Sequence, residues 1–99
     1  MSIDAGFPNA GPLVDVAAIS VTDSSAASHT VSSGKSNVLF QNVGTSPVWM
    51  GGSTVDPDNT RGYQILPKAG YAWPSVKSNF KAYFKCATGD SSTISVVEG

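Results

Sequence analysis

The residues that could carry out catalysis or hold a metal are few in this chain of 99 residues, which contains one histidine, His29, and one cysteine, Cys86. A zinc site needs three or four protein ligands, mostly Cys or His, and a nucleophilic triad needs a base aligned on an activated serine. The Gly-x-Ser-x-Gly pattern of a nucleophile elbow does not occur in the sequence. We therefore predict that the protein is not an enzyme and has no catalytic residues, no metal site and no cofactor. We expect His29 on the surface or on an edge strand, and Cys86 as a small buried apolar residue.

Two carboxylates two residues apart, Asp56 and Asp58, are the best candidates for a cation site. An EF-hand loop that began at Asp56 would need a glycine at its sixth position and a glutamate at its twelfth. Those positions hold Arg61 and Pro67, so the pattern fails where it matters most. The stretch 56–62 is therefore predicted to be a loop built on an Asx turn and a proline.

Aromatic side chains are the remaining candidates for binding. Tyrosine and tryptophan rings stack on sugars in carbohydrate-binding modules, and the same residue types dominate protein cores and interfaces. The sequence leaves both interpretations open for its five residues of these types, which are Trp49, Tyr63, Tyr71, Trp73 and Tyr83.

The composition is typical of one small folded domain. Hydrophobic residues make up 40% of the chain, which is enough for a single core, while charged residues make up only 13%. The formal net charge of -1 argues against nucleic-acid binding, which requires a clustered excess of Lys and Arg. Apolar runs are too short to span a bilayer, the first residues lack the features of a secretory signal, and one cysteine cannot form an internal disulfide. These features predict a protein that is made in the cytoplasm and binds neither membranes nor nucleic acids.

Turn signals rich in Gly, Pro, Asn, Asp and Ser recur along the whole chain. The segments between them are about 4–9 residues long, which suits strands and is short for helices. Several segments alternate apolar and polar residues with period two, as a strand does when one face is buried. The sequence thus predicts an all-β fold, either a small antiparallel β-sandwich or a jelly-roll-like barrel. The predicted strands are 16–21, 28–32, 36–43, 47–50, 80–86 and 93–97.

Two pairs of these strands are expected to form hairpins, because short turns link 36–43 to 47–50 and 80–86 to 93–97. In the segment 75–86 the apolar spacing also fits an amphipathic helix. We favour a strand there, because the Phe, Tyr and Cys content suits a pleated surface and the Thr-Gly-Asp-Ser that follows is a natural turn.

The N-terminal segment, residues 1–16, has a different character. Its glycines and prolines oppose regular structure, yet it carries more apolar side chains than a disordered linker usually does. We predict an extended arm over residues 1–16 and a single β-sandwich domain over residues 17–99. The arm either packs across its own domain or docks on a neighbouring subunit, and the sequence leaves both open. Its apolar residues include Ile3, Phe7, Leu13 and Val14.

Five stretches of the chain form a recognisable series: Asn-Val-Leu-Phe-Gln-Asn-Val-Gly (37–44), Pro-Val-Trp-Met-Gly-Gly-Ser-Thr-Val (47–55), Gln-Ile-Leu-Pro-Lys-Ala-Gly (64–70), Ala-Tyr-Phe-Lys-Cys-Ala-Thr-Gly (82–89) and Thr-Ile-Ser-Val-Val-Glu (93–98). They alternate short strands with an Asn-x-Gly turn, a Gly-Gly pair and a Pro-x-x-Gly turn. This layout resembles that of small virion-associated proteins of tailed bacteriophages. The resemblance covers residues 36–99 and implies a β-sandwich or jelly-roll-like fold with no catalytic residues.

The same resemblance implies a structural protein of the virion, most directly a head decoration or cement subunit that stabilises the capsid by binding across capsomer junctions. Its partner would be the major capsid protein or another virion protein, and it would form a homo-oligomer or a symmetric array on the particle after synthesis in the bacterial host cytoplasm. Two other functions stay open, a tail or head–tail connector accessory protein and a carbohydrate-binding module. The residues expected to contact a partner are apolar residues of the arm and aromatic residues of loops, namely Ile3, Phe7, Leu13, Trp49, Tyr63 and Trp73.

Overall fold

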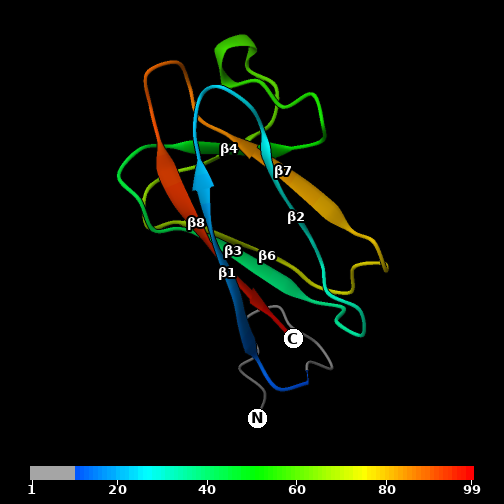
Figure 1. Cartoon of the computed structure of the whole chain (residues 1–99). Helices are drawn as coiled ribbons and strands as arrows, with labels where there is room; N and C mark the ends of the chain where they lie inside the picture. The colour runs from blue at the N-terminus through cyan, green and yellow to red at the C-terminus, as the bar shows by residue number, and fades with distance from the viewer. Residues whose placement is uncertain (1–10) are drawn as a thin grey trace.

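The computed structural model describes residues 11–99, which form two four-stranded antiparallel sheets packed face to face (Figure 1). The all-β fold predicted from the sequence is confirmed. None of the described residues belongs to a helix long and apolar enough to cross a bilayer. The elements are β1 (Val14–Val21), β2 (Ala27–Thr30), β3 (Val38–Asn42), β4 (Val48–Gly51), the short 3₁₀ helix η1 (Pro57–Asn59), β5 (Tyr63–Ile65), β6 (Gly70–Trp73), β7 (Lys81–Lys85) and β8 (Ser92–Glu98).

The chain follows the course of one long hairpin that is rolled up into two sheets. Strands β4 and β5 pair at its tip, and outward from the tip β3 pairs with β6, β2 with β7 and β1 with β8. Further ladders between β3 and β8 and between β4 and β7 join these pairs into the sheets β1-β8-β3-β6 and β2-β7-β4-β5. Eight antiparallel strands in two sheets with this order form a jelly roll.

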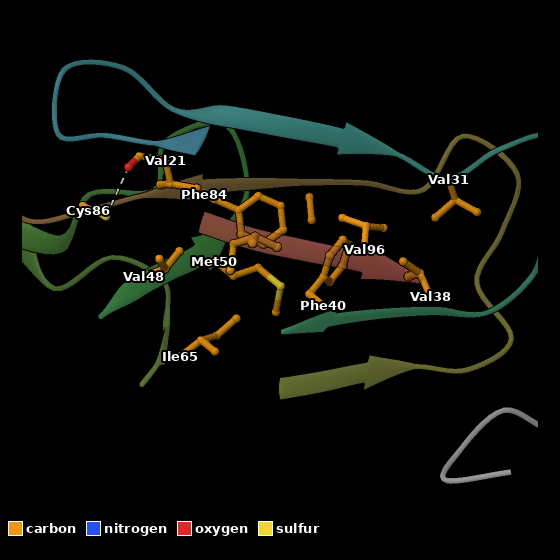
Figure 2. Packing of buried hydrophobic residues seen from close by; sticks show 12 residues of the cluster. Val21, Val31, Val38, Phe40, Val48, Met50, Ile65, Phe84, Cys86 and Val96 are labelled. Atoms are coloured by element: carbon orange, nitrogen blue, oxygen red, sulfur yellow. Dashed lines mark hydrogen bonds between the residues drawn. The ribbon is translucent and has the colours of Figure 1, made fainter. Parts of the chain in front are cut away.

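The space between the sheets is filled by apolar side chains from alternate positions of the strands. Val38 and Phe40 on β3, like Ala82 and Phe84 on β7, are buried, while the residues between them are more exposed, as predicted. The Phe40 and Phe84 rings meet edge to face with centroids 4.9 Å apart. Figure 2 shows both rings among buried valine, isoleucine and methionine side chains. Full burial of such a side chain contributes about 1.5–3 kcal/mol, so this core is the main source of stability.

The predicted hairpins are wrong, although the strands themselves are present. Strand β4 lies in the opposite sheet from β3, and β8 lies in the opposite sheet from β7. In both cases the short connection carries the chain from one sheet to the other. The apolar faces of the two strands therefore meet across the core, and the strands do not share a hydrogen-bonded ladder. The preference for a strand over a helix in 75–86 is confirmed by β7.

Strands β5 and β6 are short, and the alternation of residues does not predict them. In β5 the last residue, Ile65, is buried, whereas no residue of β6 is fully buried. Each strand lies at the edge of its sheet and pairs on one side only, β5 with β4 and β6 with β3. Their extended conformation therefore depends on pairing with a central strand more than on their own sequence.

The first strand begins earlier than predicted. β1 starts at Val14, which lies opposite Glu98 on β8, whereas the sequence pattern predicts a start at Val16. Residues 14–16, which the predicted boundary assigns to the arm, are therefore part of the sheet. What precedes β1 among the described residues is the short stretch 11–13.

Candidate functional site

The carboxylates of the 56–62 loop are engaged in hydrogen bonds within the protein. Asp56 caps η1 by accepting from the backbone N–H of Asp58 at 3.2 Å and from Nδ2 of Asn59 at 2.7 Å, so the predicted Asx turn is confirmed. Asp58 accepts from Oγ1 of Thr88 at 2.7 Å and from its backbone N–H at 3.2 Å, and these bonds hold the pKa of Asp58 below its usual value. Within residues 11–99, no three His, Cys, Asp or Glu side chains come together as a metal site would require.

Cys86 is fully buried, as expected from its place in the strand pattern. Its thiol donates a weak hydrogen bond to the backbone O of Val21 at 3.7 Å (Figure 2). Burial raises the pKa of this thiol, and the negative charges of Asp90 and Asp23 raise it further. The thiolate is the reactive and metal-binding form of cysteine, so a neutral buried thiol contributes packing and not chemistry.

His29 lies on the edge strand β2, as expected, but its side chain points into the molecule. Its Nε2 lies 2.7 Å from Oε2 of Glu98, and the two side chains are only 10% and 1% exposed. The backbone N–H of Ser32 donates to the same carboxylate at 3.1 and 3.3 Å. Because β2 and β8 belong to different sheets, this contact joins the two layers. The partner lies 69 residues away along the chain, and no local pattern predicts it.

We call His29, Ser32 and Glu98 the polar cluster. Burial by itself raises the pKa of Glu98, but the hydrogen bonds from His29 and Ser32 outweigh that effect and hold the pKa below its usual value. The carboxylate is therefore ionised and fully engaged by protein donors. Both side chains are nearly closed to solvent, and their hydrogen bonds connect the two sheets.

Four aromatic side chains form a continuous row on the other side of the sandwich. Tyr63 on β5 contacts Tyr71 on β6 with ring centroids 5.0 Å apart and an interplanar angle of 72°. Tyr71 contacts Trp73 at 5.0 Å, and Trp73 contacts Phe80, just before β7, at 5.3 Å. Such tilted and edge-to-face pairs contribute about 0.5–1.5 kcal/mol each beyond their buried area. We call these four residues the aromatic row.

The aromatic row lines a groove of about 420 Å³ between the two sheets. Tyr71 lies opposite Phe40 on β3, and Trp73 lies opposite Val38. Because Phe40 and Val38 point into the core, the two rings on β6 also face the space between the sheets. The other walls are mostly apolar and come from β4, β7 and the turn after β4, namely Met50, Gly51, Gly52, Lys81 and Ala82.

Two glycines allow the edge strands to approach the groove closely. Gly62, directly before Tyr63, has a φ of +126°, and a Cβ there would lie 2.7 Å from Cγ2 of Val55. Gly70 begins β6, and a Cβ there would lie 3.0 Å from the backbone O of Phe40. A larger residue at either position would displace β5 or β6, so the glycines help to position the aromatic row.

The indole N–H of Trp73 is the one buried side-chain polar atom of the described residues that has no hydrogen-bond partner. An unpaired buried donor costs about 1–3 kcal/mol. Any group that brought an acceptor to this atom would recover part of that cost. The groove is thus lined by apolar ring faces, and one buried donor without a partner belongs to a residue of its wall.

No match was found among protein-family models, curated proteins or solved structures. The resemblance to phage virion proteins therefore stays a prediction. What bears on function is the placement of the side chains themselves, in the polar cluster, in the groove and on the exposed surface.

Three of the five aromatic residues considered for sugar stacking lie in the aromatic row, and two do not. Trp49 and Tyr83 alternate with buried residues on β4 and β7 and so face outward from their sheet. There, Nζ of Lys81 lies 5.2 Å from the centre of the Tyr83 ring. Phe80 was not expected in a binding site, although its even spacing from the buried Phe84 is the signal that places it on the inner face.

The residues predicted to contact a partner lie in different parts of the molecule. Leu13 is 65% exposed just before β1, and Tyr63 is 56% exposed at the rim of the groove. Trp73 is half-buried inside the groove. Ile3 and Phe7 lie outside the described residues.

Proposed function

We propose that the chain is a structural protein of a bacteriophage virion, most directly a head decoration or cement subunit that binds across junctions between capsid subunits. The observation that supports this best is the placement of exposed apolar side chains at both ends of the sandwich. Leu13 and Val14 are 65% and 42% exposed at one end, and Val43 and Leu66 are 53% and 54% exposed at the other. Apolar groups at two opposite ends suit a subunit that sits between two neighbours.

The register of the strands places these two pairs apart. Val14 lies in the same row across the sheet as Val38, the first residue of β3. Val43 directly follows Asn42, the last residue of β3. Nδ2 of Asn42 donates to the backbone O of Ile65 at 2.9 Å, and Leu66 is the next residue. The two apolar pairs are thus separated by the length of β3, about 16 Å for a strand of this size.

The architecture is compatible with this role. Two-sheet jelly rolls occur in viral capsid and lectin domains, and one fold hosts many functions. In a symmetric array on a particle, each contact is repeated many times, so weak individual interfaces are sufficient. The partner is then the major capsid protein or another virion protein, and the copies form a homo-oligomer or a regular array.

The test is occupancy on purified phage particles, measured by quantitative immunoblot for the wild-type chain and for variants at the two ends. We expect that Leu13→Ser and the double variant Val43→Ser, Leu66→Ser each reduce occupancy, because each removes one of the two contacts. The exposed polar Ser53→Ala serves as the control and keeps full occupancy, and circular dichroism confirms that all variants fold. Absence of the wild-type chain from particles, or unchanged occupancy of both variants, contradicts the proposal.

The copy number distinguishes the head role from the alternative of a tail or head–tail connector protein. A decoration subunit follows the symmetry of the shell and is present in hundreds of copies, whereas a tail ring holds on the order of a dozen. Densitometry of purified particles against the major capsid protein gives this number directly.

A further inference from the structure

We propose that the groove lined by the aromatic row is the docking site of the N-terminal segment of the same chain, residues 1–10, with Phe7 seated against Tyr71 and Trp73. The proposal concerns the free subunit and goes beyond the role in the virion, on which it does not depend. Its basis is the position at which the described chain begins, the reach of the segment, and the chemistry of the groove.

The N-terminal segment is long enough to bring Phe7 from the start of β1 to the groove. Val14, Glu98, Val38 and Trp73 lie side by side across the four strands of one sheet. Three strand spacings of about 4.8 Å put Trp73 roughly 14 Å from Val14, and Tyr71, displaced by about 7 Å along β6 at right angles to that row, is roughly 16 Å from Val14. Phe7 precedes Val14 by seven residues, and an extended polyproline-type segment of that length spans about 22 Å. Phe7 therefore reaches both rings, and the remaining length allows the segment to pass from the edge of the sheet into the groove.

The described chain already leaves β1 in the required direction. Nζ of Lys35 donates to the backbone O of Pro12 at 3.5 Å. Lys35 belongs to the loop that enters β3, and β3 lies between β1 and β6 on the way to the groove. Figure 1 shows the dark-blue stretch before β1 turning aside from the line of that strand.

The sequence of the segment suits an aromatic groove. Pro8 and Pro12 flank the stretch after Phe7 and favour an extended backbone. Extended proline-containing segments bind in grooves lined by aromatic rings.

The experiment is nuclear Overhauser spectroscopy on the isotope-labelled full-length chain. We expect cross-peaks between the ring protons of Phe7 and the indole protons of Trp73, and their absence overturns the proposal. A mixture of labelled and unlabelled chains, recorded with isotope filtering, tells whether the contact lies within one chain. Cross-peaks that appear between chains show that a second copy fills the groove, and they overturn docking within the chain.

Fluorescence gives an independent readout in a Trp49→Phe background, where Trp73 is the remaining tryptophan. Adding Phe7→Ala is expected to shift the emission of Trp73 to the red and to increase its quenching by acrylamide, whereas Asn9→Ala in the same segment leaves both unchanged. Equal spectra for the two variants overturn the proposal.

Titration with glucose and with N-acetylglucosamine tests whether a sugar occupies the groove instead. If the spectral shift of Trp73 saturates at the same sugar concentration with and without Phe7→Ala, the groove is open to sugars. That result also overturns the proposal.

Discussion

The two sides of the sandwich are filled by different chemistry. On the β1–β2 side, the polar cluster connects the sheets through the contact of His29 with Glu98, at 2.7 Å between side chains that are nearly closed to solvent. On the β5–β6 side, the aromatic row connects the sheets through ring contacts of 5.0–5.3 Å and leaves a groove of about 420 Å³. The sheets are connected by hydrogen bonds to a buried carboxylate on the first side, and by contacts between rings that line a groove on the second.

The difference follows from the geometry that each kind of contact requires. A hydrogen bond to a buried carboxylate needs a donor at one distance and direction, and losing it leaves an uncompensated charge. Aromatic rings attract one another over a range of offsets and tilts, so they tolerate small shifts of the edge strands and the presence of another group. We therefore expect the β1–β2 side to carry more of the stability and the β5–β6 side to carry the binding.

The largest effect is expected from removing one member of the polar cluster. His29→Leu leaves the carboxylate of Glu98 buried with the backbone N–H of Ser32 as its remaining donor among those described above. Breaking a buried pair in this way costs about 3–5 kcal/mol of unfolding free energy. Urea denaturation followed by circular dichroism measures the loss.

The matched control for this substitution is Thr30→Ala, at an exposed position of the same strand, which should change stability by less than about 0.5 kcal/mol. The double variant His29→Leu, Glu98→Met removes the buried charge together with its partner, and it is expected to recover much of the loss. A single variant as stable as the control would show that the polar cluster does not hold the sheets together.

The second effect is the dependence of stability on pH. Because the pKa of Glu98 is lower in the folded state than in the unfolded chain, this group stabilises the fold at pH values above the usual range of a carboxyl. That stabilisation is lost as the pH falls through the folded pKa. In urea titrations between neutral and acidic pH, the wild-type chain should lose more stability than Glu98→Gln, which has no charge to lose.

Asp58 is the control for this pH dependence, because its pKa is also lowered but it lies on an exposed loop. Asp58→Asn should leave most of the acid sensitivity in place. If Asp58→Asn flattens the pH profile and Glu98→Gln does not, the acid sensitivity arises in the loop and not between the sheets.

The third effect is expected on the aromatic side. Phe80 is partly buried and packs against both the core and Trp73. Phe80→Ala should cost about 2 kcal/mol, less than a fully buried phenylalanine, because part of the ring is already in contact with solvent. Phe80→Leu keeps most of the apolar volume and should recover more than half of the loss. A cost for Phe80→Ala above that of His29→Leu would reverse the order of the two sides.

How much of this could be predicted from the sequence depends on whether the cause is local. Alternation within one segment correctly predicted the buried faces of β3 and β7, and the Asx turn at Asp56 was correctly predicted from neighbouring residues. Strand pairing was predicted incorrectly, because a short turn can link two strands of one sheet or carry the chain between sheets. Strands β5 and β6 were missed, because they acquire their conformation from the central strands with which they pair.

The two sites were predictable to different degrees for the same reason. Tyr63, Tyr71 and Trp73 were recognised as candidates because their residue types alone suggest binding, and the fold then brings them together. The contact of His29 with Glu98 was not recognised, since neither residue is unusual in its own segment. A polar pair of this kind is specified by the rolled-up course of the chain, which places β2 against β8.

The smallest effect is expected at the rim of the groove. Tyr63 is 56% exposed and contacts Tyr71 through its ring, so Tyr63→Ala should cost about 0.5–1.5 kcal/mol, the range of one aromatic pair. Tyr63→Phe keeps the ring and should be neutral in the same denaturation experiment. If Tyr63→Ala costs as much as His29→Leu, the β5–β6 side is as tightly integrated as the β1–β2 side. Tyr63 could then not move aside for a segment that binds in the groove without unfolding the sandwich. The expectation that the β1–β2 side provides stability and the β5–β6 side provides binding would then be wrong.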